Sequence, residues 1–177
     1  MDQAVWADLA VSELSKRGIL SGMGDGTFQP NRAVTREEFV KIIVEAFSLY
    51  SETATASFSD VPENEWYYSY VASAAQNGIV DGIGGSLFGT GQDITREEMA
   101  AMICRAVQVK GIELSADKDR QTFTDDSAIS DWAKENVYAL QQAGVISGMG
   151  DGTFAPAQQC TRAEAAKVVY EVTKLIW

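Results

Sequence analysis

Apolar residues recur along this chain at helical spacing, in two patterns that alternate. The first pattern occurs at Trp6, Ala10, Val11 and Leu14, and again over residues 66–74 and 132–140, with a polar lapse at Asn136. The second occurs at Phe39, Ile42, Ile43, Ala46 and Phe47, and again over residues 99–107. Steps of three and four residues place such side chains on one face of an α-helix. The sequence therefore predicts an all-α fold in which two kinds of amphipathic helix alternate.

Both patterns belong to a repeat that is present three times. In each copy a tryptophan precedes the arginine of a Thr-Arg pair by 30 residues. These pairs are Trp6 and Arg36, Trp66 and Arg96, and Trp132 and Arg162. The copies are offset by 60 and then 66 residues, and the longer junction falls within the polar stretch 110–122. We divide the chain into helix-loop-helix repeats at residues 1–50, 51–112 and 113–177.

Each repeat carries clear signals for where its helices end and begin. A glycine, which readily adopts a left-handed helix cap, follows the first helix at Gly18, Gly78 and Gly144. The second helix opens with a Thr-x-x-Glu capping box at Thr35 and Glu38, Thr95 and Glu98, and Thr161 and Glu164. The acidic pairs Glu37-Glu38 and Glu97-Glu98 are best interpreted as caps rather than as catalytic carboxylates, since acids at this position also suit the helix dipole.

A unit of about 60 residues buries too little surface to be stable alone. We therefore expect the second helices of all repeats to pack around an approximate threefold axis as a central bundle. The first helices and the loops would then form three prongs with grooves between them. The tryptophans, which share the apolar helix faces, are expected in the core.

The loop between the two helices is rich in glycine and differs among the copies. Residues 21–28 and 147–154 have the identical sequence Ser-Gly-Met-Gly-Asp-Gly-Thr-Phe. The second loop, residues 82–90, lacks the Asp-Gly turn and the following proline. The first repeat also lacks the Phe-x-Asp segment that precedes the second at Phe58 and Asp60. At Cys160, which stands where the other copies have Val34 and Ile94, we expect a packing change only.

Composition excludes several classes of function. The net charge of −11 argues against nucleic acid and against an anionic membrane surface. No apolar run approaches the ~20 residues of a membrane span. The chain has no histidine and its two cysteines form no Cys-x-x-Cys pair, so neither a metal site, nor a cofactor, nor a catalytic residue is predicted. No signal-peptide pattern follows Met1, which leaves open a cytosolic chain or a mature segment whose signal has been removed.

The ordered motifs resemble the S-layer homology domain over essentially the whole chain. They comprise Phe-Ser-Asp-Val-Pro at residues 58–62, the tryptophan at 66, the glycine at 78, the Gly-rich loop and the Thr-Arg-x-Glu cap. The resemblance implies a secreted protein held at the cell wall or S-layer of the bacterial surface. It also implies non-covalent binding of a pyruvylated secondary cell-wall polysaccharide in grooves between repeats.

The resemblance assigns ligand contact to the Thr-Arg arginines and to the glycine loops. Serines in two loops, and an aspartate in the other, add groups that could bind sugar hydroxyls. The candidate ligand-binding residues are Arg36, Arg96, Arg162, Ser21, Gly22, Met23, Gly24, Asp81, Gly82, Gly84, Ser147, Gly148, Met149 and Gly150. An arginine can bind a ketal carboxylate through two parallel N–H hydrogen bonds, and a glycine loop can add main-chain N–H donors.

The sequence also allows other interpretations. One alternative is a peptidoglycan-binding anchor of an outer-membrane protein, and another is a structural protein-protein adaptor. The arginines could instead bridge to acids of a neighbouring repeat. A hydrolase is the weakest alternative, because no nucleophile-base set is present.

Overall fold

The computed structural model describes residues 4–176, and the regular structure in this part of the chain is helical. Its α-helices are α1 (Asp8–Lys16), α2 (Arg36–Ala46), α3 (Tyr68–Gln76), α4 (Arg96–Val109), α5 (Asp131–Gln142) and α6 (Arg162–Thr173). Two short 3-10 helices, η1 (Val5–Ala7) and η2 (Asp126–Ala128), stand before α1 and α5. Between residues 4 and 176 there are isolated β-bridges but no strand, so the prediction of an all-α protein is confirmed.

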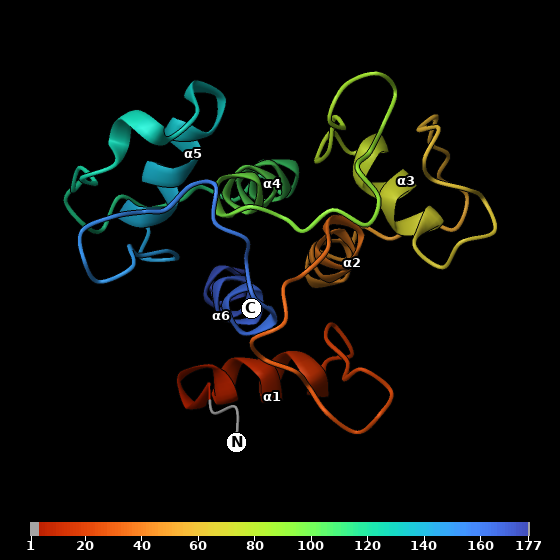
Figure 1. Ribbon diagram of the computed structural model, residues 1–177, viewed down its shortest axis with the longest axis horizontal. Helices are drawn as coiled ribbons and strands as arrows, with labels where there is room; N and C mark the ends of the chain where they lie inside the picture. Colours follow the sequence, from red (N-terminus) through yellow and green to blue (C-terminus); the bar gives the residue numbers. More distant parts are fainter. Residues whose placement is uncertain (1–3, 177) are drawn as a thin grey trace.

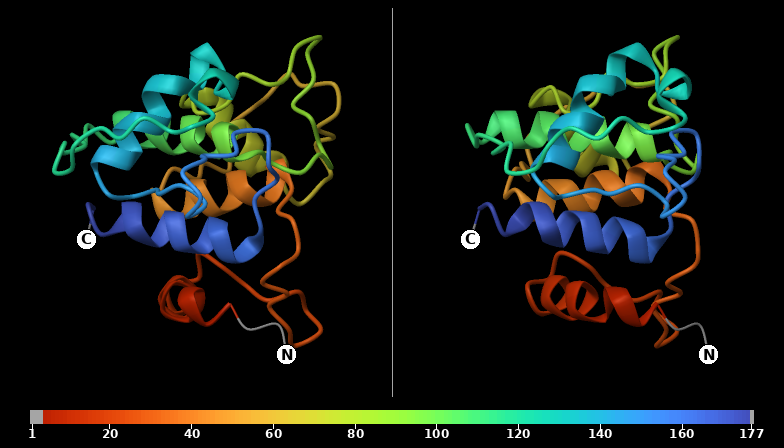
Figure 2. Two further views of the ribbon diagram at one scale, coloured as in Figure 1. Left: turned by 60° about the vertical axis from the view of Figure 1, so that its left-hand side comes forward. Right: turned by 90° about the vertical axis from the view of Figure 1, so that its left-hand side faces the viewer.

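The second helices of the repeats form the centre of the molecule. Figure 1 shows α2, α4 and α6 nearly end-on in the middle, with α1, α3 and α5 outside them. In both views of Figure 2 the central helices run side by side, and each of them contacts the other two. Three outer lobes, each made of a first helix and its loops, surround this centre.

Each outer helix packs on the central helix of a different repeat. The helix α3 packs on α2 and α5 packs on α4, so each lies against the second helix of the preceding repeat. The helix α1 packs on α6, so the first repeat lies against the last. The three repeats therefore form a closed ring, in which no repeat buries its apolar faces by itself.

The predicted helix signals are present in the structure. Capping boxes with both reciprocal hydrogen bonds open α2, α4 and α6. The glycines that follow the outer helices, Gly18, Gly78 and Gly144, have φ values of 72°, 69° and 73°, as a left-handed cap requires.

The expectation that the tryptophans lie in the core is wrong. Trp6, Trp66 and Trp132 are 56%, 55% and 54% exposed, whereas the residue after each of them is buried. In the first repeat the buried face runs through Ala7, Ala10 and Leu14, at helical spacing. One residue is about 100° of helix rotation, so a tryptophan one place earlier points off this face.

The segments before the central helices are tied together by a ring of hydrogen bonds. The backbone N–H of Val34 donates to the carbonyl of Cys160, Cys160 donates to Ile94, and Ile94 donates to Val34, each over 2.9 Å. All three side chains are fully buried. The ring sets the positions of the following residues, Arg36, Arg96 and Arg162, at the start of each central helix.

Candidate ligand-binding grooves

Three grooves lie between the repeats, and each joins a glycine loop to an arginine from another repeat. Groove 1 is lined by Ile19, Leu20, Ser21, Gly22, Met23, Glu38, Lys41, Ile42, Trp66 and Arg162. Groove 2 is lined by Arg36, Val80, Asp81, Gly82, Ile83, Glu98, Ala101, Met102, Arg105 and Trp132. Groove 3 is lined by Trp6, Arg96, Met99, Lys118, Gly144, Val145, Ile146, Ser147, Gly148, Met149, Glu164, Lys167, Val168 and Glu171. Their volumes are about 280, 390 and 600 Å³.

The arginines are anchored by main-chain carbonyls of the loops. The Nε of Arg36 donates to Phe88 O over 3.0 Å, that of Arg96 to Phe154 O over 2.8 Å, and that of Arg162 to Phe28 O over 2.8 Å. Each guanidinium also lies over the ring of the same phenylalanine, at 4.7–5.2 Å from its centroid. The arginine therefore fixes the loop against the central helix as well as lining the groove.

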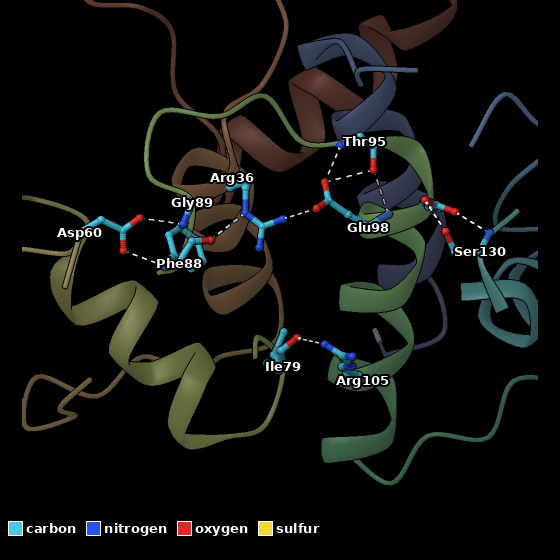
Figure 3. A network of polar contacts seen from close by, with 10 residues as sticks. Arg36, Asp60, Ile79, Phe88, Gly89, Thr95, Glu98, Arg105 and Ser130 are labelled. Atoms are coloured by element: carbon cyan, nitrogen blue, oxygen red, sulfur yellow. Dashed lines mark hydrogen bonds and ion pairs between the residues drawn. The ribbon is translucent and has the colours of Figure 1, made fainter. Parts of the chain in front are cut away.

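A second contact of the arginine distinguishes the grooves. In grooves 1 and 3, Nη2 of Arg162 and of Arg96 donates to the carbonyl of the loop serine, over 2.7 and 3.1 Å. In groove 2, Nη1 of Arg36 lies 2.6 Å from Glu98, the capping glutamate of α4, as Figure 3 shows.

The capping glutamates differ in how closely they approach the groove arginines. Arg96 lies 3.5 Å from Glu164, a longer separation than that between Arg36 and Glu98. In groove 1 the capping glutamate, Glu38, is paired with Arg32. The bridge to a neighbouring acid, left open by the sequence, is therefore present for Arg36 and Arg96.

The guanidinium groups are largely buried. Arg36, Arg96 and Arg162 are only 4–6% exposed, so a ligand can reach them only through the grooves that they line. Burial lowers the pKa of Arg162, the nearby Arg32 lowers it further, and Glu38 opposes both.

The structure brings most of the predicted site residues to the grooves. Ser21, Gly22 and Met23 line groove 1, Asp81 and Gly82 line groove 2, and Ser147, Gly148 and Met149 line groove 3, each with its arginine. Gly24, Gly84 and Gly150 do not line these grooves; they lie further along the exposed loops. A Cβ at Gly82 or Gly148 would stand 2.4 or 2.6 Å from a carbonyl oxygen of its own loop, so these turns require glycine.

Several groove residues were not predicted from the sequence. One tryptophan lines each groove: Trp66 in groove 1, Trp132 in groove 2 and Trp6 in groove 3. In each case the loop and the arginine of the groove come from the other two repeats. Lys41 and Lys167 occupy equivalent positions in grooves 1 and 3, where groove 2 has Ala101. The offset of the repeats reveals this lysine position, because residues 41, 101 and 167 keep the register of the arginines.

The charged side chains that line the grooves differ in their balance. Groove 1 has Lys41 and Arg162 against Glu38, two positive charges and one negative, which gives +1. Groove 3 has Arg96, Lys118 and Lys167 against Glu164 and Glu171, which also gives +1, and Lys167 donates a hydrogen bond to Glu171 there. Groove 2 has Arg36 and Arg105 against Asp81 and Glu98, which gives zero, and Arg105 is bound to Asp81 over 3.0 Å.

The remaining acids of the capping segments have structural partners. Glu97 accepts hydrogen bonds from the backbone N–H and the hydroxyl of Ser130, and Glu37 accepts one from the N–H of Gly91. Within residues 4–176 there is no cluster of three histidine, cysteine or carboxylate side chains that could hold a metal ion. In the same part of the chain no helix has the length and apolarity needed to cross a membrane.

Comparison with known proteins decides the family. The model of the S-layer homology domain matches residues 1–40, 57–100 and 122–166, one match within each repeat. The chain belongs to the S-layer homology domain family. It is thus a cell-surface module of the kind that anchors proteins to the cell wall.

Relatives of this S-layer homology module include surface-layer proteins and an enzyme. It is 36% identical over 93% of its length to an amylopullulanase of Thermoanaerobacterium thermosulfurigenes. It is 31% identical over 92% of its length to the surface-layer 125 kDa protein of Lysinibacillus sphaericus, and 31% identical over 96% to the S-layer protein sap of Bacillus anthracis. The matched regions cover 9%, 14% and 20% of these relatives, so the chain spans only a small part of their length.

Proposed function

We propose that this module is a non-catalytic anchor that binds a pyruvylated secondary cell-wall polysaccharide in grooves 1 and 3. One observation carries the proposal. In both grooves a buried arginine, a lysine, an exposed tryptophan and a glycine loop converge on one solvent-accessible hollow with a positive charge balance. This is a suitable arrangement for a sugar that bears a carboxylate.

The arginine and lysine would bind the carboxylate of the pyruvate ketal. Because Nε and Nη2 of Arg96 and Arg162 already donate to main-chain carbonyls, the carboxylate would approach from the Nη1 side. In groove 3 it would compete there with Glu164, which lies 3.5 Å from Nη1 of Arg96. A lysine of a neighbouring central helix would add a second charge-assisted bond: Lys41 of α2 in groove 1 and Lys167 of α6 in groove 3. Each such bond contributes about 1.5–3 kcal/mol.

The tryptophan would form the apolar wall of the sugar site. Pyranose rings present C–H groups on one face, and an exposed indole offers a large flat surface to them at low entropic cost. Loop hydroxyls such as those of Ser21 and Ser147, which are exposed, would bind sugar hydroxyls.

Groove 2 is expected to contribute little to this binding. Its arginine is neutralised by Glu98 at 2.6 Å, and its second cation, Arg105, is bound to Asp81. A carboxylate entering this groove would have to displace one of these acids and would meet a charge balance of zero. In groove 3, Arg96 and Lys167 also have acidic partners, Glu164 and Glu171, but Lys118 leaves the balance at +1. Two functional grooves on one module would still give avidity on a repeating polymer.

A pull-down from cell-wall sacculi tests the ligand. Native sacculi, sacculi stripped of secondary polymer and sacculi from cells that lack the pyruvyl group are incubated with the module. Retention on native sacculi alone supports the proposal. Equal binding to stripped sacculi favours peptidoglycan, and failure to bind any sacculi, together with capture by a surface protein, favours an adaptor.

Charge variants test which grooves are used. Replacing both Lys41 and Lys167 with methionine should reduce binding to native sacculi by at least about tenfold. Lys16→Met, at an exposed lysine outside the grooves, is the matched control and should bind normally. Ala101→Lys adds the missing cation to groove 2 and should raise the number of bound ligands.

The salt dependence tests how the ligand is recognised. The net charge of −11 repels an anionic polymer at long range, so attraction must come from donors inside the grooves. Binding should therefore survive molar salt with only a modest loss of affinity. A loss of several orders of magnitude would contradict recognition by local donors.

A further inference from the structure

The capping glutamate of a neighbouring central helix pairs with the groove arginine in two of the three grooves. In grooves 2 and 3 these ion pairs span 2.6 and 3.5 Å, and Figure 3 shows the one in groove 2. In groove 1 the capping glutamate is Glu38, which pairs with Arg32 and not with Arg162. The arginine of groove 1 therefore keeps its charge available, and the reason lies in the residue that binds the acid.

Arg32 stands where the other repeats have an uncharged residue. Its Nη2 donates to the carboxylate of Glu38 and to Sδ of Met23, and both of these residues line groove 1. The counterparts of Arg32 are Gln92 and Gln158. All three hold the same place in the fold, because each main-chain carbonyl accepts a 2.9 Å hydrogen bond from the N–H of a groove arginine. The exchange of glutamine for arginine thus adds a cation that neutralises the capping acid.

A second acid is held away from the lysine of groove 1. Glu45 follows Lys41 by four residues, one turn along α2. The equivalent residues of groove 3, Lys167 and Glu171, form an ion pair. In groove 1 the hydroxyl of Tyr70 instead donates to Glu45 over 2.8 Å, and the ammonium of Lys41 lies over the ring of Tyr70, 5.4 Å from its centroid.

Tyr70 has the chemistry to hold both groups apart. Burial and the hydrogen bond to Glu45 raise the pKa of Tyr70 to about 12, so its hydroxyl stays protonated and continues to donate. The face of its ring attracts an ammonium group. The counterparts of Tyr70 are Ala10 and Asn136, which have no aromatic ring. Glu45 accordingly does not line groove 1, whereas its counterpart lines groove 3.

We propose that Arg32 and Tyr70 are positioning residues that make groove 1 the strongest carboxylate site of the module. They hold Glu38 and Glu45 away from the two cations that line the groove. Neither of these cations forms an ion pair with a carboxylate of residues 4–176. This role rests on the proposed function, because the ketal carboxylate is the group that the two cations would bind.

The same carboxylate would bind less tightly in groove 3. There it competes with Glu164 for Arg96 and with Glu171 for Lys167. A charge-assisted hydrogen bond changes affinity by about tenfold or more. Partial competition by these acids should therefore separate the affinities of grooves 1 and 3 by about fivefold or more.

The tryptophan of each groove is a local reporter for the test. The indole N–H signals of Trp66, Trp132 and Trp6 report grooves 1, 2 and 3, and they are followed by NMR at constant ionic strength. The probe is the dimethyl ketal of pyruvate, which carries one carboxylate and cannot bridge two grooves. Its methyl ester is the uncharged control. The dissociation constant from Trp66 should be about fivefold or more below that from Trp6, and the ester should move neither signal.

Each positioning residue is tested by removing it and then neutralising the acid that it holds. Tyr70→Phe keeps the ring but releases Glu45, and Arg32→Gln installs the residue of the other repeats and releases Glu38. Each change should weaken binding in groove 1 by about fivefold and leave groove 3 unchanged. Adding Glu45→Gln to the first variant, or Glu38→Gln to the second, should restore binding. Glutamine at position 38 still completes the capping box.

Two further variants serve as control and as transplant. Tyr50→Phe removes the hydroxyl of an exposed tyrosine whose ring lies 4.9 Å from that of Tyr70, and it should bind as the parent chain does. Gln158→Arg places the guanidinium of the first repeat at an exposed position of the third, within reach of Glu164. It should strengthen binding in groove 3 by about fivefold.

Equal affinities in grooves 1 and 3, or no response of the three signals to the probe, would overturn the proposal. Losses that the added glutamines do not restore would indicate a structural role for Arg32 and Tyr70 and would also overturn it. Failure of the proposed function is seen separately, with sacculi. Binding of the probe with the expected variant effects, but no preference for sacculi that carry pyruvate, would contradict the wall ligand and support the positioning role.

Discussion

The backbone N–H of Val34 donates a 2.9 Å hydrogen bond to the carbonyl of Cys160, which joins the first repeat to the third. The bonds from Cys160 to Ile94 and from Ile94 to Val34 complete a ring just before the N-terminal ends of the central helices. The three side chains occupy equivalent, fully buried places. These places should therefore require apolar side chains. Cys160, which stands where the other repeats have valine and isoleucine, is the position at which this requirement can be measured.

Replacing Cys160 should distinguish apolar packing from polar burial. Cys160→Val places the residue of the first repeat in the third and should change the free energy of unfolding by less than about 1 kcal/mol. Cys160→Ser places a hydroxyl in the same dry site, where the thiol now faces the sulfur of Met99, and should cost about 1–3 kcal/mol. Urea denaturation of both variants measures the difference. Equal losses for valine and serine would contradict the view of Cys160 as a small hydrophobe.

The two thiols should be protected in the native protein. Burial raises the pKa of Cys104 to about 12, and burial together with the charge of Glu164 raises that of Cys160 to about 12. At pH 8 both thiols are protonated and shielded, so alkylation by iodoacetamide should require opening of the fold. Labelling rates should rise sharply across the urea transition. Rapid labelling of either thiol in the native protein would contradict this prediction.

Asp60 should make stability depend on pH in the acidic range. Burial alone would raise its pKa, but hydrogen bonds from the N–H groups of Phe88, Thr90 and Gly89 outweigh this and lower the pKa below its ordinary value of 3.8. A lowered pKa in the folded state means that the carboxylate stabilises the fold above the ordinary pKa. This contribution is lost as the pH falls through 3.8 toward the folded pKa.

The pH dependence can be assigned with a variant of Asp60. Asp60→Asn should cost about 1–3 kcal/mol at pH 6, since an amide cannot accept the same charge-assisted hydrogen bonds. It should also flatten the decline of the unfolding midpoint between pH 5 and pH 3. Glu63→Gln, at an exposed position two residues beyond Val61, is the control and should leave the decline unchanged. Parallel pH curves for Asp60→Asn and the parent chain would contradict the assignment.

Trp66 should matter for binding rather than for folding. Its side chain is 55% exposed and lines groove 1, so Trp66→Ala should change stability by about 0.5 kcal/mol or less. Binding to native sacculi should fall by about fivefold or more, because the apolar wall of the groove is lost. Trp66→Phe retains a ring and should recover part of the affinity. A large loss of stability with unchanged binding would contradict this prediction and indicate a structural role for Trp66.

The helix signals could be interpreted from sequence because they are local. A threonine and a glutamate three residues apart form a capping box whatever lies around them, and all three predicted boxes are present. The place of the tryptophans was predicted wrongly because Trp6 stands one residue before Ala7, which begins the buried face. A buried face that includes Trp6 and one that begins at Ala7 both have helical spacing. Which of the two is buried depends on the helix that packs against it.

The groove partners depend on contacts that sequence spacing does not reveal. Arg162 meets Ser21 and Phe28, which lie in the first repeat, because α1 packs on α6. Each groove thus combines a loop, an arginine and a tryptophan from three different repeats. Repeat register identified the equivalent residues, but not which of them come together.

The packing of α1 on α6 also sets the order in which the three lobes can dock during synthesis. While the chain emerges from the ribosome, the second and third lobes can dock as soon as they appear, since α3 and α5 follow their partners α2 and α4. The first lobe has no such partner until the last helix has been made. A nascent chain that is stalled before residue 162 should therefore expose α1 to proteases, and its release should bury it.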